Sequence, residues 1–251
     1  MFPPLARKMN DSRQALLSTS MLRSKREYIV VSVGGSLIVP DQIDTEFLKR
    51  FRELILRKVD EGFSFFIITG GGKTARRYQQ SAEAVRGGLS REDVDWLGIH
   101  STRLNAHLMR ALFIEQAQAR IVKNYGRSLR GKDSIIIGAG WKPGWSTDYC
   151  AAMAAKHLGA KKMVNLSNID YVYTADPKKD PNATKIEQIG WTDFRELIPK
   201  EWDPGLSSPF DPVAAREAQA NHMEVAIING GKLEEFEKYV SGEPFVGTVI
   251  S

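Results

Sequence analysis

Short apolar runs recur along this chain, and three of them end at a glycine turn. They cover residues 28–33, 63–69 and 134–137, and they are rich in Val, Ile and Phe. Runs of this length bounded by glycine are typical of buried strands in a parallel sheet. Turns that follow parallel strands meet at the carboxyl edge of the sheet, where α/β proteins bind their ligands. The pattern therefore predicts a ligand site at that edge.

Longer segments between these runs place apolar residues at helical spacing. Residues 43–62 form one such segment, and residues 78–118 form another that is broken at Gly87 and Gly88, with Ser90 as an expected N-cap. Later segments continue the alternation, with helices expected over 149–158, 192–198, 211–222 and 232–240, and strands over 119–124, from 161 onward, over 224–230 and over 245–251. This alternation predicts an α/β domain.

Residues 63–76 combine a strand, a glycine turn and a helix start. The strand runs into Gly70, Gly71 and Gly72, and Lys73 and Arg76 follow in the first helical turns. Glycines let backbone N–H groups approach a ligand, and a helix N-terminus favours negative charge. We expect this stretch to bind an anion, most simply a phosphate.

Composition narrows the class of protein without choosing a substrate. The 251 residues are 42% hydrophobic, which is enough for one large α/β domain or two small ones. A single cysteine, Cys150, excludes an internal disulfide framework and suits a reducing compartment. A net charge of +5 fits either a nucleic-acid binder or a protein that handles phosphorylated small molecules.

Residues 1–27 differ from the rest of the chain. They contain early prolines, scattered basic residues and serines, with no uninterrupted apolar core and no small-residue cleavage pattern. We interpret them as an extension that is partly disordered or packs between subunits. Because no later segment approaches the roughly 20 apolar residues of a membrane span, we expect a soluble, cytoplasmic protein without membrane partners.

Three other types of site are disfavoured by the sequence. A P-loop fails because Ile67 stands where its first glycine should be. A dinucleotide motif fits Gly70, Gly72 and Ala75, but its acidic partner would fall within a helical segment. His100 and His107 share a helix face, yet a metal site would need a third ligand that the pattern does not supply, so no protein-held metal is expected.

Two loops carry further candidate chemistry. In the first, Ser146, Thr147 and Asp148 start a helix, where hydroxyl and amide groups either cap the helix or hold phosphate oxygens. The second follows the strand that begins at residue 161, and it is long, polar and rich in Asp, Lys and Pro. It is either a solvated connection or a ligand loop at the sheet edge.

Taken in order, these motifs resemble the amino acid kinase superfamily, and within it the uridylate (UMP) kinases of the archaeal type. The resemblance extends from about residue 28 to residue 251 and is carried by the strings GGS, GGGKTAR, DWLGIHSTRLNA, PGWSTD, NIDYVYTADPKKDP, SSPFDPVAA and a terminal GT. It implies a three-layer αβα sandwich around a mostly parallel sheet. Residues 28–150 would then bind the acceptor nucleotide and residues 151–251 would bind ATP.

The same resemblance implies roles for individual residues. Lys73 and Asp148 would be catalytic. ATP would be bound by Gly35, Ser36, Gly72, Arg76, Ser167, Asn168, Tyr173 and Asp176. UMP would be bound by Gly71, Asp95, Trp141, Lys142, Pro143, Gly144, Trp145, Ser146 and Thr147. The implied reaction is direct in-line transfer from ATP to UMP, with Mg²⁺ carried on the nucleotide, in a homo-oligomer that is commonly a hexamer.

Departures from the family pattern keep two other functions open. Ser32 replaces a lysine found in many superfamily members, Tyr171 replaces a glycine, and Trp141, Lys142 and Trp145 replace smaller or histidine residues. The same fold could therefore phosphorylate a different small acceptor, or it could bind nucleotides or oxyanions without turnover. Nucleic-acid binding is not expected, because the basic residues are dispersed.

Overall fold

The computed structural model describes residues 26–127, 129, 132–201 and 208–251. The expected N-terminal extension over residues 1–27 lies outside this part of the chain, except for Arg26 and Glu27. Arg26 ties the beginning of the described domain to the sheet edge, since its guanidinium donates to the Ser134 hydroxyl at 2.9 Å.

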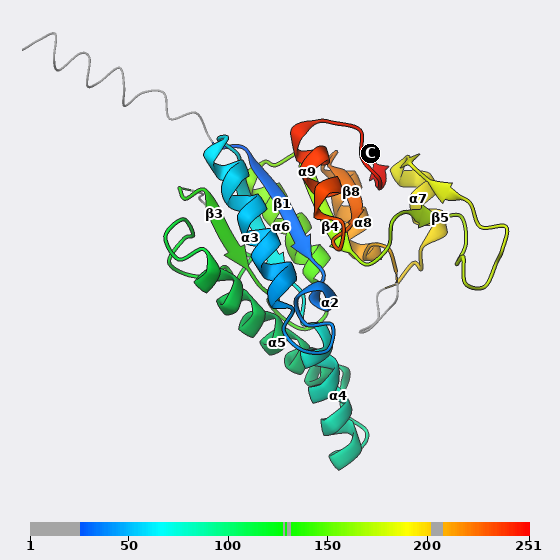
Figure 1. The fold of residues 1–251 in the computed structure, drawn as a ribbon. Helices are drawn as coiled ribbons and strands as arrows, with labels where there is room; N and C mark the ends of the chain where they lie inside the picture. The colour runs from blue at the N-terminus through cyan, green and yellow to red at the C-terminus, as the bar shows by residue number, and fades with distance from the viewer. Residues whose placement is uncertain (1–25, 128, 130–131, 202–207) are drawn as a thin grey trace, which may run out of the picture.

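A twisted seven-stranded sheet forms the centre of the described structure (Figure 1). Its strand order is β3-β2-β1-β4-β8-β9-β7, and neighbours are parallel except for β8 and β9. The strands are β1 (Tyr28–Val33), β2 (Ser64–Thr69), β3 (Ile135–Gly138), β4 (Lys162–Ser167), β8 (Glu224–Asn229), β9 (Thr248–Ile250) and β7 (Gln188–Ile189). A separate antiparallel hairpin pairs β5 (Val172–Tyr173) with β6 (Lys185–Ile186).

Alternate residues of each central strand face opposite hydrophobic cores. In β1, Ile29 and Val31 belong to one buried cluster, whereas Tyr28 and Val30 belong to the other. Because both faces are covered, every residue of β1 and β2 is buried. This explains why these strands appear in the sequence as continuous apolar runs instead of alternating patterns.

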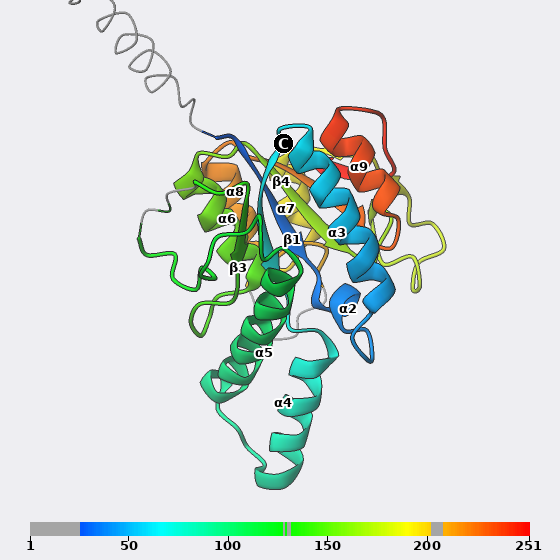
Figure 2. The same cartoon turned by 60° about the vertical axis from the view of Figure 1, so that its left-hand side comes forward.

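Helices cover both faces of the sheet, so the expected three-layer αβα sandwich is confirmed (Figures 1 and 2). One core includes α6 (Thr147–Leu158), α7 (Trp191–Leu197) and α8 (Pro212–Ala220). The other includes α2 (Gly35–Ile38), α3 (Thr45–Asp60), α5 (Arg91–Leu112) and α9 (Leu233–Ser241).

The helix α4 (Gly72–Arg86) packs mainly on α5, and Figure 2 shows the two helices extending beyond the end of the sheet near α2. The predicted break at Gly87 and Gly88 is confirmed, because both residues have positive φ angles, of 67° and 60°. The predicted cap at Ser90 is also confirmed, since its hydroxyl accepts from the Asp93 amide at 3.1 Å.

The strand predicted over residues 119–124 is wrong. This segment runs beside β3, but in the described part of the chain it makes one isolated bridge, Val122 to Gly138, and a second bridge joins Ala117, just before the segment, to Ile135. The segment lies at the open edge of the sheet, where it has one neighbour and its polar residues Arg120 and Asn124 are exposed. Local strand propensity therefore did not produce a continuous ladder.

Among the helices that the structure describes, none combines the length and the apolar character required to cross a bilayer.

Candidate active site

The candidate site lies where the strand order reverses. From β1 the chain continues to β2 and β3 on one side, and β4 and β8 lie on the other. Such a switch point leaves a crevice at the carboxyl ends of the strands. Here the Gly34 amide donates to the Leu166 carbonyl at 2.8 Å, which joins the turn after β1 to the end of β4. A cavity of about 390 Å³ opens at this point, lined by the turns that follow β1, β2, β3 and β4.

Two glycine turns interlock at the floor of this cavity. A Cβ atom on Gly35 would lie 2.0 Å from the Gly72 nitrogen, and one on Gly70 would lie 2.4 Å from the Gly35 nitrogen. Gly72 also has a φ of 63°, which a side chain would strain. These glycines are thus required for the contact between the turns themselves, a reason that the ligand-based interpretation of the sequence did not include.

Several amides at these turns already have protein partners. Besides that of Gly34, the amide of Gly70 donates to Val33 at 2.9 Å and that of Lys73 donates to Val39 at 2.9 Å. These N–H groups fix the shape of the two glycine turns and are not available to bind a phosphate.

Asp148 lies in the first turn of α6, which Ser146 caps by accepting from the Tyr149 amide at 3.0 Å. Asp148 lines the cavity, and its Oδ1 accepts a hydrogen bond of 2.9 Å from the Ser32 hydroxyl. Burial and the nearby Asp211 carboxylate raise the pKa of Asp148 to about 6, while the hydrogen bond from Ser32 acts in the opposite direction. A serine thus stands at the position of the missing lysine and contacts the central carboxylate directly.

Asp211 is a neighbour of this centre to which the sequence interpretation assigned no role beyond starting a helix. Its Oδ1 caps α8 by accepting from the Ala214 amide at 2.6 Å. Its Oδ2 is buried and has no hydrogen-bond partner among the described residues, and burial raises the pKa of this carboxyl group. The Asp-Pro pair at a helix start is a standard capping signal, which gave no indication of a second carboxylate beside Asp148.

Polar residues of α5 hold the turns around the cavity, and these were also not predicted. The Asn105 side chain donates to the Gly70 carbonyl at 2.8 Å, and the Thr102 hydroxyl accepts from the Gly140 amide at 2.8 Å. Arg103 donates to the Trp141 carbonyl at 2.7 Å. The signal in the sequence that could have identified these residues is a cluster of polar positions on a helix face that otherwise contacts the core.

The loop after β3 is rich in aromatic side chains. Trp141 and Trp145 contact each other edge to face with centroids 4.6 Å apart, and Trp145 continues to Tyr149 at 4.2 Å. The Lys142 ammonium lies over both indoles, 4.7 Å from the Trp141 centroid and 5.2 Å from that of Trp145. Asp95 anchors the same loop by accepting from the Gly144 amide at 2.7 Å.

The structure brings most of the expected site residues to the one cavity. Those that line it are Gly35, Ser36, Gly71, Gly72, Arg76, Asp95, Trp145, Ser146, Thr147, Asp148, Ser167 and Asn168. Pro143 and Gly144 line an adjoining cavity that also includes Asp95. Trp141, Lys142, Lys73, Tyr173 and Asp176 do not line the main cavity.

Lys73 illustrates how the fold redirects a motif residue. Its ammonium lies 3.1 Å from the Asp41 carboxylate, which Arg77 also contacts at 2.6 Å. The hydrogen bond and charge of Lys73, together with Arg77, lower the pKa of Asp41. Lys73 is therefore neutralised on the outer side of the glycine turn in this conformation.

Tyr173 and Asp176 lie on the β5–β6 hairpin beyond the cavity. Tyr173 pairs with Lys185 across the hairpin, and Asp176 closes the following turn by accepting from the Lys178 amide at 3.0 Å. Tyr171, the residue that replaces a family glycine, packs against Lys185 with the ammonium 4.9 Å from its ring centroid, so its side chain does not narrow the main cavity.

Within the described residues, no group of three or more His, Cys, Asp or Glu side chains is arranged to hold a metal ion. The cavity instead offers backbone turns, hydroxyl groups and the single carboxylates Asp95 and Asp148. This donor set fits a metal that is shared with nucleotide phosphates better than one enclosed by protein ligands.

Comparisons with known proteins agree with this architecture. The model of the amino acid kinase family matches residues 27–229. A uridylate kinase from Methanocorpusculum labreanum is 33% identical over 225 residues, covering 88% of this chain and 94% of that protein. One from Pyrococcus abyssi is 37% identical over 190 residues, covering 74% and 83%.

A solved structure extends the similarity to three dimensions. The crystal structure of uridylate kinase from Archaeoglobus fulgidus aligns with a TM-score of 0.75 and 31% identity, over 89% of this chain and 99% of that one. The sequence resemblance stated above is thereby confirmed. This chain belongs to the amino acid kinase family, in which its relatives include archaeal uridylate kinases.

Proposed function

We propose that this protein is a uridylate kinase that transfers the γ-phosphoryl group of ATP to UMP. The observation that carries the proposal is the single cavity at the strand switch point, where two interlocked glycine turns face the Asp148 carboxylate. The proposal is supported by relatives of that name that match over most of their own length.

We assign the acceptor to the part of the cavity formed within residues 28–150. Gly71 and Asp95 would contact UMP, and the loop over residues 141–147 would enclose it. Trp145 lines the cavity and offers an indole on which a base can stack. Pro143 and Gly144 would extend this acceptor side through the adjoining cavity.

We assign the donor to the segments on the other side of Asp148. Gly35 and Ser36 would bind the ATP phosphates together with Gly72 and Arg76. Residues 151–251 would supply the rest of the donor site through Ser167 and Asn168, with Tyr173 and Asp176 at its outer end. Mg²⁺ carried on the nucleotide would neutralise part of the phosphate charge.

The proposed chemistry is a direct exchange between two nucleotides. An oxygen of the UMP phosphate forms a bond to the γ-phosphorus of ATP, and the bond between that phosphorus and the β–γ bridging oxygen breaks, which releases ADP and UDP. Such a transfer depends on alignment and charge stabilisation more than on covalent catalysis. Asp148 would organise the point where the phosphates meet. Lys73 would contribute only after leaving Asp41, and full turnover in a Lys73→Ala variant would remove it from the mechanism.

The function is tested by measuring ADP release from ATP and Mg²⁺ with a panel of nucleoside monophosphates. Acceptor-free and carboxylate controls belong in the same assay. We expect release that depends on UMP. Release with a different acceptor alone would assign another substrate to the cavity, and tight ATP binding without release under any condition would indicate a binding protein.

We further propose that the protein is a cytoplasmic homo-oligomer. Light scattering would measure its oligomeric state, and the family resemblance predicts a hexamer.

A further inference from the structure

The cavity is short of positive charge for the reaction assigned to it. Among the described residues that line it, Arg76 is the basic side chain, against the carboxylates of Asp95 and Asp148. Phosphoryl transfer between two nucleotides concentrates negative charge that must be balanced at the reacting centre. Ser32 stands where many superfamily members have a lysine, and Lys73 does not line the cavity, so it could add charge only after leaving its exposed ion pair with Asp41. An additional cation is therefore to be sought next to the donor side.

Lys232 lies in a loop that touches two of the proposed donor segments. The loop follows β8, which pairs with β4 in a register that sets Asn229 opposite Ser167. The Gly230 amide donates to the Ser167 carbonyl at 2.8 Å. A Cβ atom on Gly230 would lie 2.2 Å from the Leu37 side chain, so the loop also packs against α2, immediately after Ser36.

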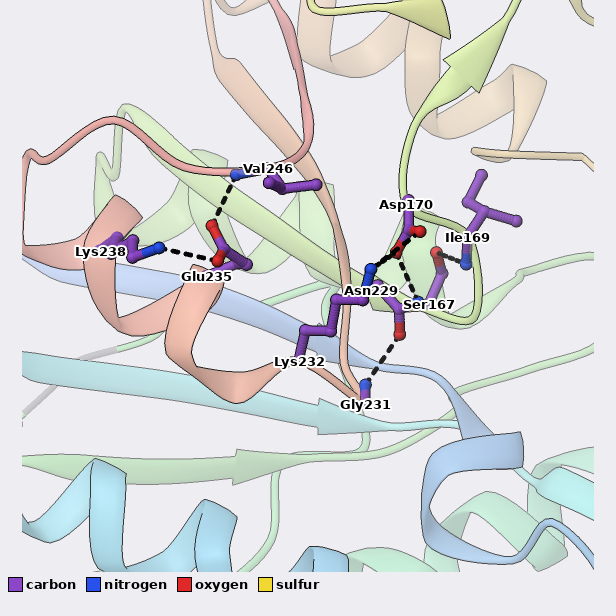
Figure 3. Close-up of polar contacts among 9 residues, drawn as sticks. All are labelled: Ser167, Ile169, Asp170, Asn229, Gly231, Lys232, Glu235, Lys238 and Val246. Carbon is purple, nitrogen blue, oxygen red and sulfur yellow. Dashed lines mark hydrogen bonds and ion pairs between the residues drawn. The ribbon is translucent and has the colours of Figure 1, made fainter.

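Asp170 holds Lys232 in the present conformation. The Lys232 ammonium lies 2.9 Å from the Asp170 carboxylate, which also accepts from the Asn229 side chain at 2.8 Å (Figure 3). The two charged side chains are 46% and 37% exposed. An ion pair this exposed contributes little to stability, so separating it costs little. The pair is suited to exchange one anionic partner for another.

We propose that Lys232 is a donor-site cation, held by Asp170 when no nucleotide is bound and transferred to an ATP phosphate on binding. This inference rests on the proposed function insofar as ATP is the donor, but it does not depend on the identity of the acceptor. Asp170 and Asn229 then act as positioning residues that keep the ammonium beside the cavity.

The alternative is an ion pair that merely joins two loops, and the two explanations predict different behaviour for the two partners. If the pair is structural, removal of either partner breaks the same contact and both variants weaken ATP binding alike. If Lys232 binds phosphate, Lys232→Met loses a charge-assisted contact, whereas Asp170→Asn frees the ammonium from its competing anion.

The experiment measures binding of a non-hydrolysable ATP analogue by calorimetry, together with KM values for ATP and UMP. For Lys232→Met we expect the Kd of the analogue and the KM for ATP to rise by about tenfold or more, with the KM for UMP within about twofold. Lys232→Arg should recover most of the affinity. Asp170→Asn should bind the analogue at least as tightly as the wild type.

The matched control is Lys238→Met. Lys238 lies on α9 and forms a comparable ion pair of 2.8 Å with Glu235, away from the loop that contacts Ser167 and Leu37 (Figure 3). This variant should bind the analogue like the wild type.

Wild-type affinity in Lys232→Met, or equal losses in Lys232→Met and Asp170→Asn, would overturn the inference. Because the analogue is titrated without acceptor, tight binding combined with failure of UMP-dependent turnover would overturn only the proposed function. A wild-type protein that does not bind the analogue would overturn both.

Discussion

At the scale of single residues, the site depends on a carboxylate whose ionisation is poised near neutrality. Burial and the Asp211 charge raise the pKa of Asp148 to about 6. The Ser32 hydroxyl acts in the opposite direction, because its hydrogen bond stabilises the charged form of Asp148. Ser32, which stands at the position of the family lysine, therefore contacts this carboxylate directly. This arrangement has consequences for both stability and activity.

Asp148→Asn should stabilise the fold while it reduces turnover. Because the folded pKa of about 6 lies above the ordinary aspartate value of 3.8, an ionised Asp148 lowers the free energy of unfolding at neutral pH, by at most about 3 kcal/mol. The difference should be largest above pH 6 and vanish below pH 4, where the carboxyl is protonated in both folded and unfolded protein. Denaturant melts of both proteins from about pH 3 to pH 8 measure it, and a variant that is less stable at pH 8 than the wild type would contradict the account.

Ser32→Ala should shift the acidic limb of the pH–activity profile. Removal of the hydrogen bond raises the pKa of Asp148 further, so activity should be lost at a higher pH than in the wild type. The UMP phosphate itself titrates near pH 6. The pKa of free UMP is the same for every protein variant, so an unchanged acidic limb of kcat/KM in Ser32→Ala would assign that limb to the substrate.

At the scale of secondary-structure elements, the site is built from contacts between turns. The turn after β1 and the turn before α4 approach so closely that their glycines contact one another. These turns were predictable because the apolar runs over residues 28–33 and 63–69 both end at glycine. Their mutual contact was not, because it joins segments about 35 residues apart, such as Gly35 and Gly70, and depends on strand order.

Gly35→Ala should disrupt both the fold and nucleotide binding. Its Cβ would fall 2.0 Å from a backbone nitrogen, so the turns must separate, and we expect a loss of about 3 kcal/mol in the free energy of unfolding. Gly190→Ala is the control, because no atom lies within 4 Å of its Cβ position and its φ is −71°. That variant should lose less than about 1 kcal/mol. Equal stability of the two variants in denaturant melts would show that the turns can separate freely.

Other features of the site could not be read from the sequence because they depend on distant partners. The direction of Lys73 is set by Asp41 in a preceding loop, and the neighbour of Asp148 is contributed by Asp211 at the start of α8. In the sequence, Asn105 is one polar residue within a helical pattern, and its contact with Gly70 is visible only in the folded structure. Conversely, the segment at 119–124 had strand propensity but lies at an edge with one neighbour.

At the scale of the whole molecule, the strand order explains why one cavity can serve two nucleotides. The chain builds β1, β2 and β3 toward one edge and then β4 and β8 on the other side of β1, so two sets of loops meet above the same strand ends. The acceptor assignment uses the first set and the donor assignment uses the second, with Asp148 between them. Direct transfer between the two nucleotides is the central claim that follows.

The most direct test uses ATP labelled in its γ-phosphoryl group, with the intact protein, Mg²⁺ and UMP. The account predicts that the label appears in the β-phosphate of UDP in the same amount as the ADP formed. It also predicts that no label becomes attached to the protein when UMP is omitted. Label trapped on the protein without acceptor, or ADP formed in the presence of UMP without labelled UDP, would contradict direct transfer to UMP.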